Sequence, residues 1–201
     1  MKLHFGCGTV LREGWVNVDA WLPDVVKHEF VEDKPGVWRD GETTFILQSQ
    51  PQDLSCIRAG VVEELCSCHV MEHFHPTIAY ELLGEFQRVL VPGVGWMEHQ
   101  TPDFDSLVAM WRQLVGNAAD DASMGVLGAF DYERYLTVVN GVLCPFQFSS
   151  SYPQHKSLWN GTLALFLLTR WGFEDIEAKV VGTDLVCSAT APAGAYNTIR
   201  L

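Results

Sequence analysis

The chain has 201 residues and a formal net charge of −12. Its content of 48% hydrophobic and 19% charged residues excludes an intrinsically disordered protein. The length suits one well-buried domain, 1–201. The acidic balance argues against nucleic acid as a partner, because nucleic-acid binding depends on neutralising phosphates with Lys and Arg.

The sequence lacks the long uncharged apolar run that a membrane-spanning helix needs, and it lacks a basic leader followed by an apolar core. We therefore expect no membrane partner and a cytoplasmic location. The six cysteines are scattered along the chain, which does not fit a disulfide framework at this length. Free thiols are the expected state, as is usual in the cytosol.

Strand-like runs alternate with helical patterns, which predicts an α/β fold with a mostly parallel sheet. The expected strands in the first half of the chain are residues 2–6, 15–18, 44–47 and 61–68. From 77 to 91 apolar residues recur at helical spacing, and the following Pro92-Gly93 ends that helix.

The second half begins with an expected strand at 95–100. Residues 104–150 form the least regular part of the chain, with one expected helix at 106–115, and we interpret this part as an insertion that caps the substrate. A helix at 158–170 and a closing strand pair at 173–181 and 183–189 complete the domain.

The most informative motif lies at the start, where the strand-like Lys2–Phe5 runs into Gly6-Cys7-Gly8 and soon reaches Asp19. Two glycines without Cβ atoms allow a ligand to approach the backbone closely. A carboxylate at the end of the next strand is the usual partner of ribose hydroxyls. Only ten residues separate Gly8 from Asp19. This spacing predicts a short or missing first crossover helix and disfavours NAD, whose acidic residue comes about 20 residues on.

Four segments in order make the chain resemble the class I S-adenosylmethionine-dependent methyltransferases, in particular the small type-11-like group. The segments are residues 4–8 with 14–19, residues 68–74, residues 85–93 with 101–103, and residues 155–159 with 171–173. The resemblance implies a Rossmann-like, doubly wound, mostly parallel sheet with a C-terminal antiparallel strand pair. It also implies S-adenosyl-L-methionine as the cofactor.

The same resemblance implies roles for individual residues. The backbone of Phe5, Gly6, Cys7 and Gly8 would approach the methionine part of the cofactor, and Asp19 would accept hydrogen bonds from both ribose hydroxyls. His69 would lie beside the sulfonium. The acidic residue that the family places near the adenine has no clear counterpart, and the candidates for this contact are Gln50 and Asp53.

An oxygen or nitrogen acceptor would benefit from a base with a pKa near neutrality, and histidine suits this task. We hypothesise that His69 or His155 is the catalytic base, with His99 and Asp103, near the end of the expected fifth strand, as further candidates. The aromatic residues within 104–150 indicate a small, partly apolar or sugar-like acceptor.

Two other functions are consistent with the sequence. The shortened crossover and the glutamine near the adenine position allow an inactive protein that binds S-adenosylmethionine and has a regulatory role. In addition, His69-x-x-Glu72-His73 matches a zinc-hydrolase pattern, in which histidines four residues apart share one helix face. Because this motif directly follows an expected strand, as in the methyltransferases, we expect no metal there.

Overall fold

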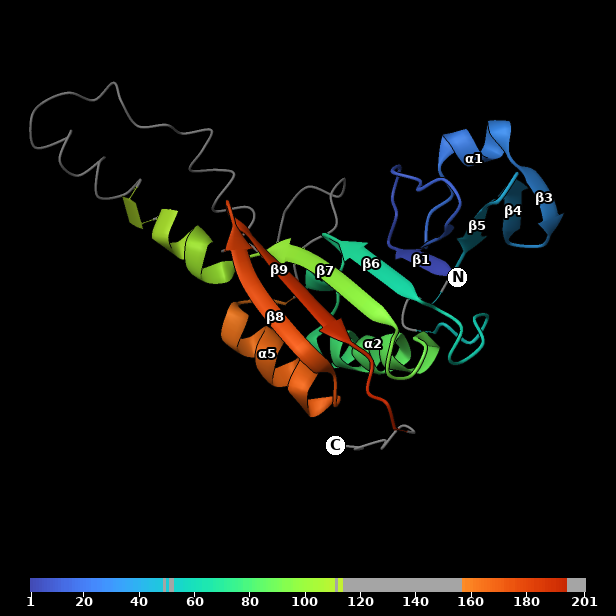
Figure 1. The fold of residues 1–201 in the computed structure, drawn as a ribbon. Helices are drawn as coiled ribbons and strands as arrows, with labels where there is room; N and C mark the ends of the chain where they lie inside the picture. Colours follow the sequence, from blue (N-terminus) through green and yellow to red (C-terminus); the bar gives the residue numbers. More distant parts are fainter. Residues whose placement is uncertain (49, 51–52, 111, 114–156, 195–201) are drawn as a thin grey trace, which may run out of the picture.

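The computed structural model describes residues 1–48, 50, 53–110, 112–113 and 157–194. Within these residues nine strands form one sheet with the order β3-β4-β5-β2-β1-β6-β7-β9-β8 (Figure 1). The central five strands are parallel to one another. They are β5 (Thr43–Leu47), β2 (Val16–Asp19), β1 (Lys2–Phe5), β6 (Glu64–Cys68) and β7 (Trp96–Pro102). The predicted α/β class is confirmed, and each predicted strand of this group overlaps an observed one.

Antiparallel pairs extend the sheet on both sides. On one side β4 (Val37–Asp40) pairs with β5, and β3 (Val31–Lys34) pairs with β4. On the other side β9 (Asp184–Thr190) pairs with β7, and β8 (Glu174–Val181) forms the edge beside it. The hairpin of β8 and β9 corresponds to the predicted closing pair, whereas β3 and β4 were not predicted.

Helices cover both faces of the sheet. The helices α2 (Pro76–Val89) and α5 (Gly161–Arg170) lie together on one face (Figure 1), where their buried residues join those of the central strands in the main core. The short helix α1 (Asp24–Glu29) belongs to a second cluster, in which Val26 packs with Phe45 of β5. Because Phe45 and Ile46 are consecutive in a strand, they point to opposite faces, and Ile46 contacts the main core.

The sequence explains α2 directly. Ala79, Leu82, Leu83 and Phe86 recur at the predicted helical spacing and are buried against the sheet. The N-cap is His75, whose Nδ1 accepts a hydrogen bond from the backbone N–H of Thr77. His75 therefore serves as a helix cap.

Two connections contain no helix among the residues that the structure describes. Residues 6–15 link β1 to β2 through turns, and the described part of 48–63 links β5 to β6 in the same way. Residues 104–110 and 112–113 are helical, so this helix begins two residues earlier than predicted. The rest of the expected capping insertion, residues 114–150, lies outside the described residues.

The described cysteines, which are Cys7, Cys56, Cys66, Cys68 and Cys187, are all free thiols. None of the helices in the described ranges has the length and apolar character needed to cross a membrane.

Candidate active site

The turn after β1 brings its backbone against the end of β2. Gly6 and Gly8 both have positive φ angles, of 67° and 52°. The Gly6 N–H donates to the carbonyl oxygen of Val18 at 2.8 Å, and the Gly8 N–H donates to Oδ2 of Asp19 at the same distance. The other carboxylate oxygen of Asp19, Oδ1, accepts from the N–H of Trp21 at 3.0 Å. Each oxygen retains a second lone pair for a ligand hydroxyl.

A small cavity of about 110 Å³ lies at this edge of the sheet, where the carboxyl ends of the parallel strands meet. It is lined mainly by apolar side chains, with one carboxylate and one amide among them. The lining residues are Phe5, Gly6, Val18, Asp19, Ala20, Gln48, Val70 and Phe74. Complete ligand pockets usually measure about 300–1,000 Å³, so this cavity would hold only part of a nucleoside-bearing ligand.

The structure places Gln48 in this cavity beside Asp19. Gln50 is exposed, and its carbonyl oxygen accepts from Nε2 of Gln48 at 3.2 Å. Asp53 is also exposed and lines a different, larger cavity. Gln48 was not among the predicted contacts, although its place directly after β5, at the carboxyl edge of the sheet, is a usable signal.

The side chains of Phe5 and Cys7, on either side of Gly6, lie in different surroundings. Phe5 is buried, lines the small cavity and packs edge-on against Phe86 of α2, with ring centroids 5.2 Å apart. The side chain of Cys7 is buried in the second cluster with Val26 and Phe45. Burial raises the pKa of the Cys7 thiol to about 12, so this group stays protonated. Only the backbone of Cys7 is therefore available at this turn.

His69 lies directly after β6 and is held between two carboxylates. Its Nδ1 lies 3.3 Å from Oε1 of Glu72, and its Nε2 lies 3.4 Å from Oδ2 of Asp184 in β9. Gln100 in β7 donates from Nε2 to the same Asp184 oxygen at 2.7 Å. The hydrogen bond that His69 donates to Glu72 raises the pKa of His69, and the charge of Asp184 adds to this effect, although partial burial opposes it. The imidazole is therefore stabilised in its cationic form.

Glu72 is a buried carboxylate with only 1% of its surface exposed. Its Oε2 accepts from the hydroxyl of Thr101 at 3.2 Å, and its Oε1 faces His69. Burial raises the pKa of Glu72, but the hydrogen bond from His69 and further favourable interactions more than offset this effect, and the net pKa is lowered. Glu72 therefore forms the buried anionic end of a polar network that links the end of β6 with β7 and β9 and reaches the surface at His69.

The His69–His73 segment does not adopt the helical geometry that a zinc site would require. Only Met71–His73 forms a single 3₁₀ turn, and His69 precedes it with φ of 53°. The two histidines therefore do not share a helix face. Among the described residues, no group of three or more His, Cys, Asp or Glu side chains is arranged to hold a metal ion.

Two of the further base candidates are used structurally. His99 is buried on the face of the sheet that α2 and α5 cover, and its Nδ1 lies 3.0 Å from the hydroxyl of Ser67. Burial lowers the pKa of His99 to about 4. The Oδ2 of Asp103, also buried, accepts from the N–H of Ser106 at 2.8 Å and so caps the helix that begins at 104. His155 lies outside the described residues.

The comparisons with solved structures establish the fold. A methyltransferase described as S-adenosylmethionine-dependent, from Methanosarcina mazei, matches with a TM-score of 0.56 and 14% identity over 94% of this chain and 92% of that chain. A second one, from Archaeoglobus fulgidus, has a TM-score of 0.54 and 13% identity, with coverage of 93% and 84%. The fold of the present chain is therefore that of the S-adenosylmethionine-dependent methyltransferases.

The CurJ carbon methyltransferase also matches, with a TM-score of 0.54 and 14% identity over 94% of this chain. The present chain spans only 48% of that protein, and it spans 61% of another matching structure. No protein-family model matches the sequence, and neither does any curated protein. At these identities the similarity concerns the fold.

Proposed function

We propose that the protein is an S-adenosylmethionine-dependent methyltransferase that acts on an oxygen or nitrogen atom of a small molecule. The observation that carries this proposal is the position of Asp19 beside the Gly6–Gly8 turn and a cavity, at the carboxyl edge of a sheet with the methyltransferase fold. When bound, the cofactor supplies an electrophilic methyl group on a sulfonium. The acceptor class, including a sugar-like acceptor, is part of the proposal.

The residues present suit the cofactor in several respects. The carboxylate of Asp19 is fixed by two backbone N–H groups and has lone pairs left for two hydroxyls. A Cβ atom at position 6 would collide with Val70 on the opposite wall, so only glycine leaves the turn this close to the cavity. Gln48 offers an amide at the same cavity. We assign the ribose to Asp19 and an adenine contact to Gln48, Gln50 or Asp53.

The chain would contribute mainly by orienting the acceptor. A displacement at a methyl group gains much of its rate from alignment of the reacting atoms. His69 is also a candidate base, but its pKa is raised by Glu72 and Asp184. Removal of an acceptor proton would then require His69 to be neutral first, so the rate should rise with pH through the pKa of His69. His155 is the alternative base.

The first experiment is thermal unfolding of the purified protein with S-adenosylmethionine, S-adenosylhomocysteine or NAD. A ligand at about 100 times its Kd adds about 2.7 kcal/mol of stability. For a domain of this size the expected shift is about 5–10 °C. A shift with both sulfur compounds and none with NAD supports the proposal, whereas no shift with any of them contradicts it.

A catalytically inactive, cofactor-binding protein is the second candidate. It is favoured by the observation that His69 is held between two carboxylates and so is not a free base. Turnover of any acceptor in a panel of small alcohols, phenols and amines would exclude this alternative. Tight binding of S-adenosylhomocysteine without transfer to any member of the panel would favour it.

A further inference from the structure

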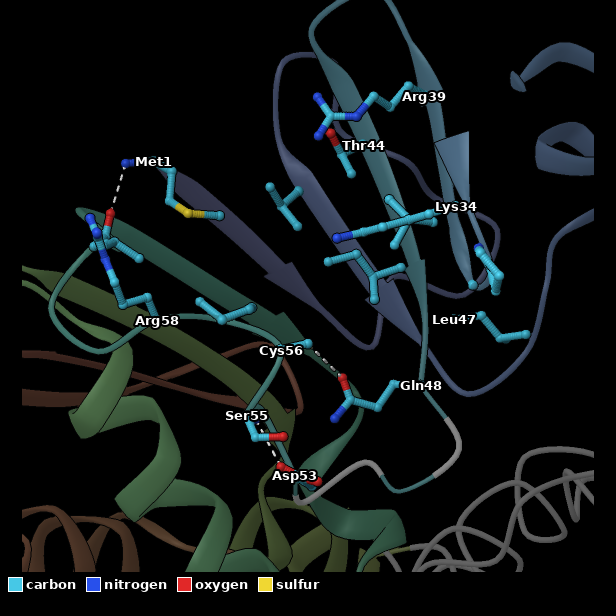
Figure 2. A pocket seen from close by; sticks show the side chains of 17 residues that line it. Met1, Lys34, Arg39, Thr44, Leu47, Gln48, Asp53, Ser55, Cys56 and Arg58 are labelled. Atoms are coloured by element: carbon cyan, nitrogen blue, oxygen red, sulfur yellow. Dashed lines mark hydrogen bonds between the residues drawn. The ribbon is translucent and has the colours of Figure 1, made fainter. Parts of the chain in front are cut away.

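A second, larger cavity of about 700 Å³ lies on the face of the sheet that α2 and α5 cover, near its β3–β4 edge (Figure 2). One wall is formed by β2, β4 and β5 through Val16, Val37 and Ile46, and the other by Asp53, residues 55–58 and Val61. Its volume falls within the range of about 300–1,000 Å³ that is usual for small-molecule sites.

Among the described residues, no helix covers this part of the sheet, which leaves space for the cavity. The described residues between β5 and β6 form turns, and hydrogen bonds attach them to α2. The guanidinium of Arg88 donates to the carbonyl oxygens of Leu54 and Ile57, at 2.8 and 3.0 Å, and to the carboxylate of Glu85. The N–H of Leu54 donates to the same carboxylate at 3.1 Å. This wall is therefore fixed by hydrogen bonds to a helix.

The charge of the cavity is opposite to that of the protein. The chain has 25 acidic and 13 basic residues, yet the cavity lining contains three basic residues and one acidic residue, Asp53. The basic residues come from both sides: Lys34 and Arg39 from the β3–β4 hairpin, and Arg58 from the opposite wall (Figure 2).

Two of these cations are available to a ligand. Arg39 forms an exposed ion pair with Asp33 at 3.1 Å. The side chains of Lys34 and Arg58 form no ion pair or hydrogen bond with any residue in the described ranges. Burial raises the pKa of the Cys56 thiol, and the charges of Arg88 and Lys34 act in the opposite direction. The ammonium of Lys34 is therefore close enough to influence Cys56 on the facing wall.

We propose that this cavity binds a small organic anion that has an apolar body, with the anionic group attracted by Lys34 and Arg58 on the two facing walls and the body against Val16, Ile46 and Ile57. An apolar floor with a few convergent polar groups is the usual composition of such a site. The overall charge of −12 repels anions, so their binding depends on this local reversal of sign. Gln48 lines both cavities, so the two sites share a side chain. The proposal does not rest on methyltransferase activity.

The test uses a matched pair of fluorescent probes, 8-anilinonaphthalene-1-sulfonate and N-phenyl-1-naphthylamine. They share an aromatic body, and only the first has an anionic group. The variant Lys34→Gln/Arg58→Gln removes the two available cations. The control Lys2→Gln/Lys179→Gln removes two exposed cations elsewhere, which gives the same net charge. All four side chains are exposed. Lys2 also forms an exposed ion pair with Glu64 and lies over the ring of Trp15, contacts that contribute little at the surface, so both double variants should fold.

We expect saturable binding of the sulfonate to the wild type and to the control. The Lys34/Arg58 variant should bind it about tenfold more weakly, equivalent to about 1.4 kcal/mol, and the binding of the neutral probe should be the same in all three proteins. The substitution Ser55→Trp, at an exposed position in the lining, should weaken the binding of both probes. Equal sulfonate affinity in the two double variants, or unchanged binding after Ser55→Trp, would overturn the proposal.

Discussion

The substitutions Gly6→Ala and Gly8→Ala should differ in effect although both glycines have positive φ angles. An added Cβ at position 6 would lie 2.7 Å from Cγ1 of Val70 and closer still to Cγ2. At position 8 the same Cβ would meet no atom within 4 Å. Gly8→Ala therefore measures the effect of backbone conformation alone, and Gly6→Ala measures this effect together with the collision.

A left-handed backbone at a residue with a Cβ costs about 1–2 kcal/mol. Overpacking adds about 1–3 kcal/mol. We therefore expect the free energy of unfolding to fall by about 1.5 kcal/mol for Gly8→Ala and about 3.5 kcal/mol for Gly6→Ala. At about 3 °C per kcal/mol for a domain of this size, the melting temperatures should fall by about 5 and about 10 °C.

A double-mutant cycle with Val70→Ala isolates the steric part. This substitution removes both Cγ atoms and leaves only the Cβ of Val70, 3.0 Å from the added Cβ. The double variant should therefore recover most of the overpacking energy, a coupling of about 1–3 kcal/mol. Urea unfolding of the wild type and the variants measures it. Equal destabilisation by Gly6→Ala and Gly8→Ala, or no recovery with Val70→Ala, would refute the close approach of the turn to Val70.

Three further predictions concern the polar groups. Burial lowers the pKa of His99 from 6.5 to about 4, so the unfolded chain binds a proton at this histidine more readily than the folded protein does. The contribution of His99 to the free energy of unfolding is therefore constant above about pH 6.5 and decreases as the pH falls from 6.5 to about 4. In His99→Asn the loss of unfolding free energy between about pH 7 and about pH 4.5 should be smaller by about 2–3 kcal/mol. Urea titrations at both pH values test this, and equal losses would contradict it. Glu72→Gln should lower the pKa of His69 more than Asp184→Asn does, because the hydrogen bond to Glu72 is the largest cause of the raised pKa. NMR titration of His69 measures both effects. A larger decrease in Asp184→Asn would contradict the dominant role of Glu72. Asp19→Ala should abolish the thermal shift with S-adenosylhomocysteine, whereas Asp105→Ala, a control outside both cavities, should retain it.

The central sheet was predictable because its signals are local. The parallel strands contain short segments with β-branched or apolar residues, such as Thr43–Leu47 in β5, and in α2 the buried positions 79, 82, 83 and 86 follow the helical period. The β3–β4 hairpin was not predictable by this route. Val31–Lys34 is exposed at every residue and includes three charged side chains, so it has no alternation of buried and exposed positions. It forms a strand because β4 pairs with β5 at the edge of the sheet.

The parts of the candidate site that a local motif determines through the backbone were predictable. The parts that depend on contacts between side chains distant in the sequence were not. The Gly6–Gly8 turn and Asp19 follow from glycine geometry and the end of a strand. The role of His69 depends on Asp184, which lies 115 positions away in the sequence and approaches only through the β7–β9 pairing. His99 was a plausible base by position, but strand alternation turns it toward the helix-covered core. No local pattern contains these contacts.

The position of Asp19 shows how folding and ligand binding can use the same groups. Its two carboxylate oxygens each accept a backbone N–H, from Gly8 and Trp21, so the carboxylate is oriented before a ligand arrives. Ligand binding therefore does not require an additional loss of conformational entropy at this side chain. The Gly8 bond also ties the turn after β1 to the end of β2 without a crossover helix. The short connection between these strands therefore depends on the same carboxylate that we assign to the ribose, and loss of Asp19 should weaken both the turn and the binding of the cofactor.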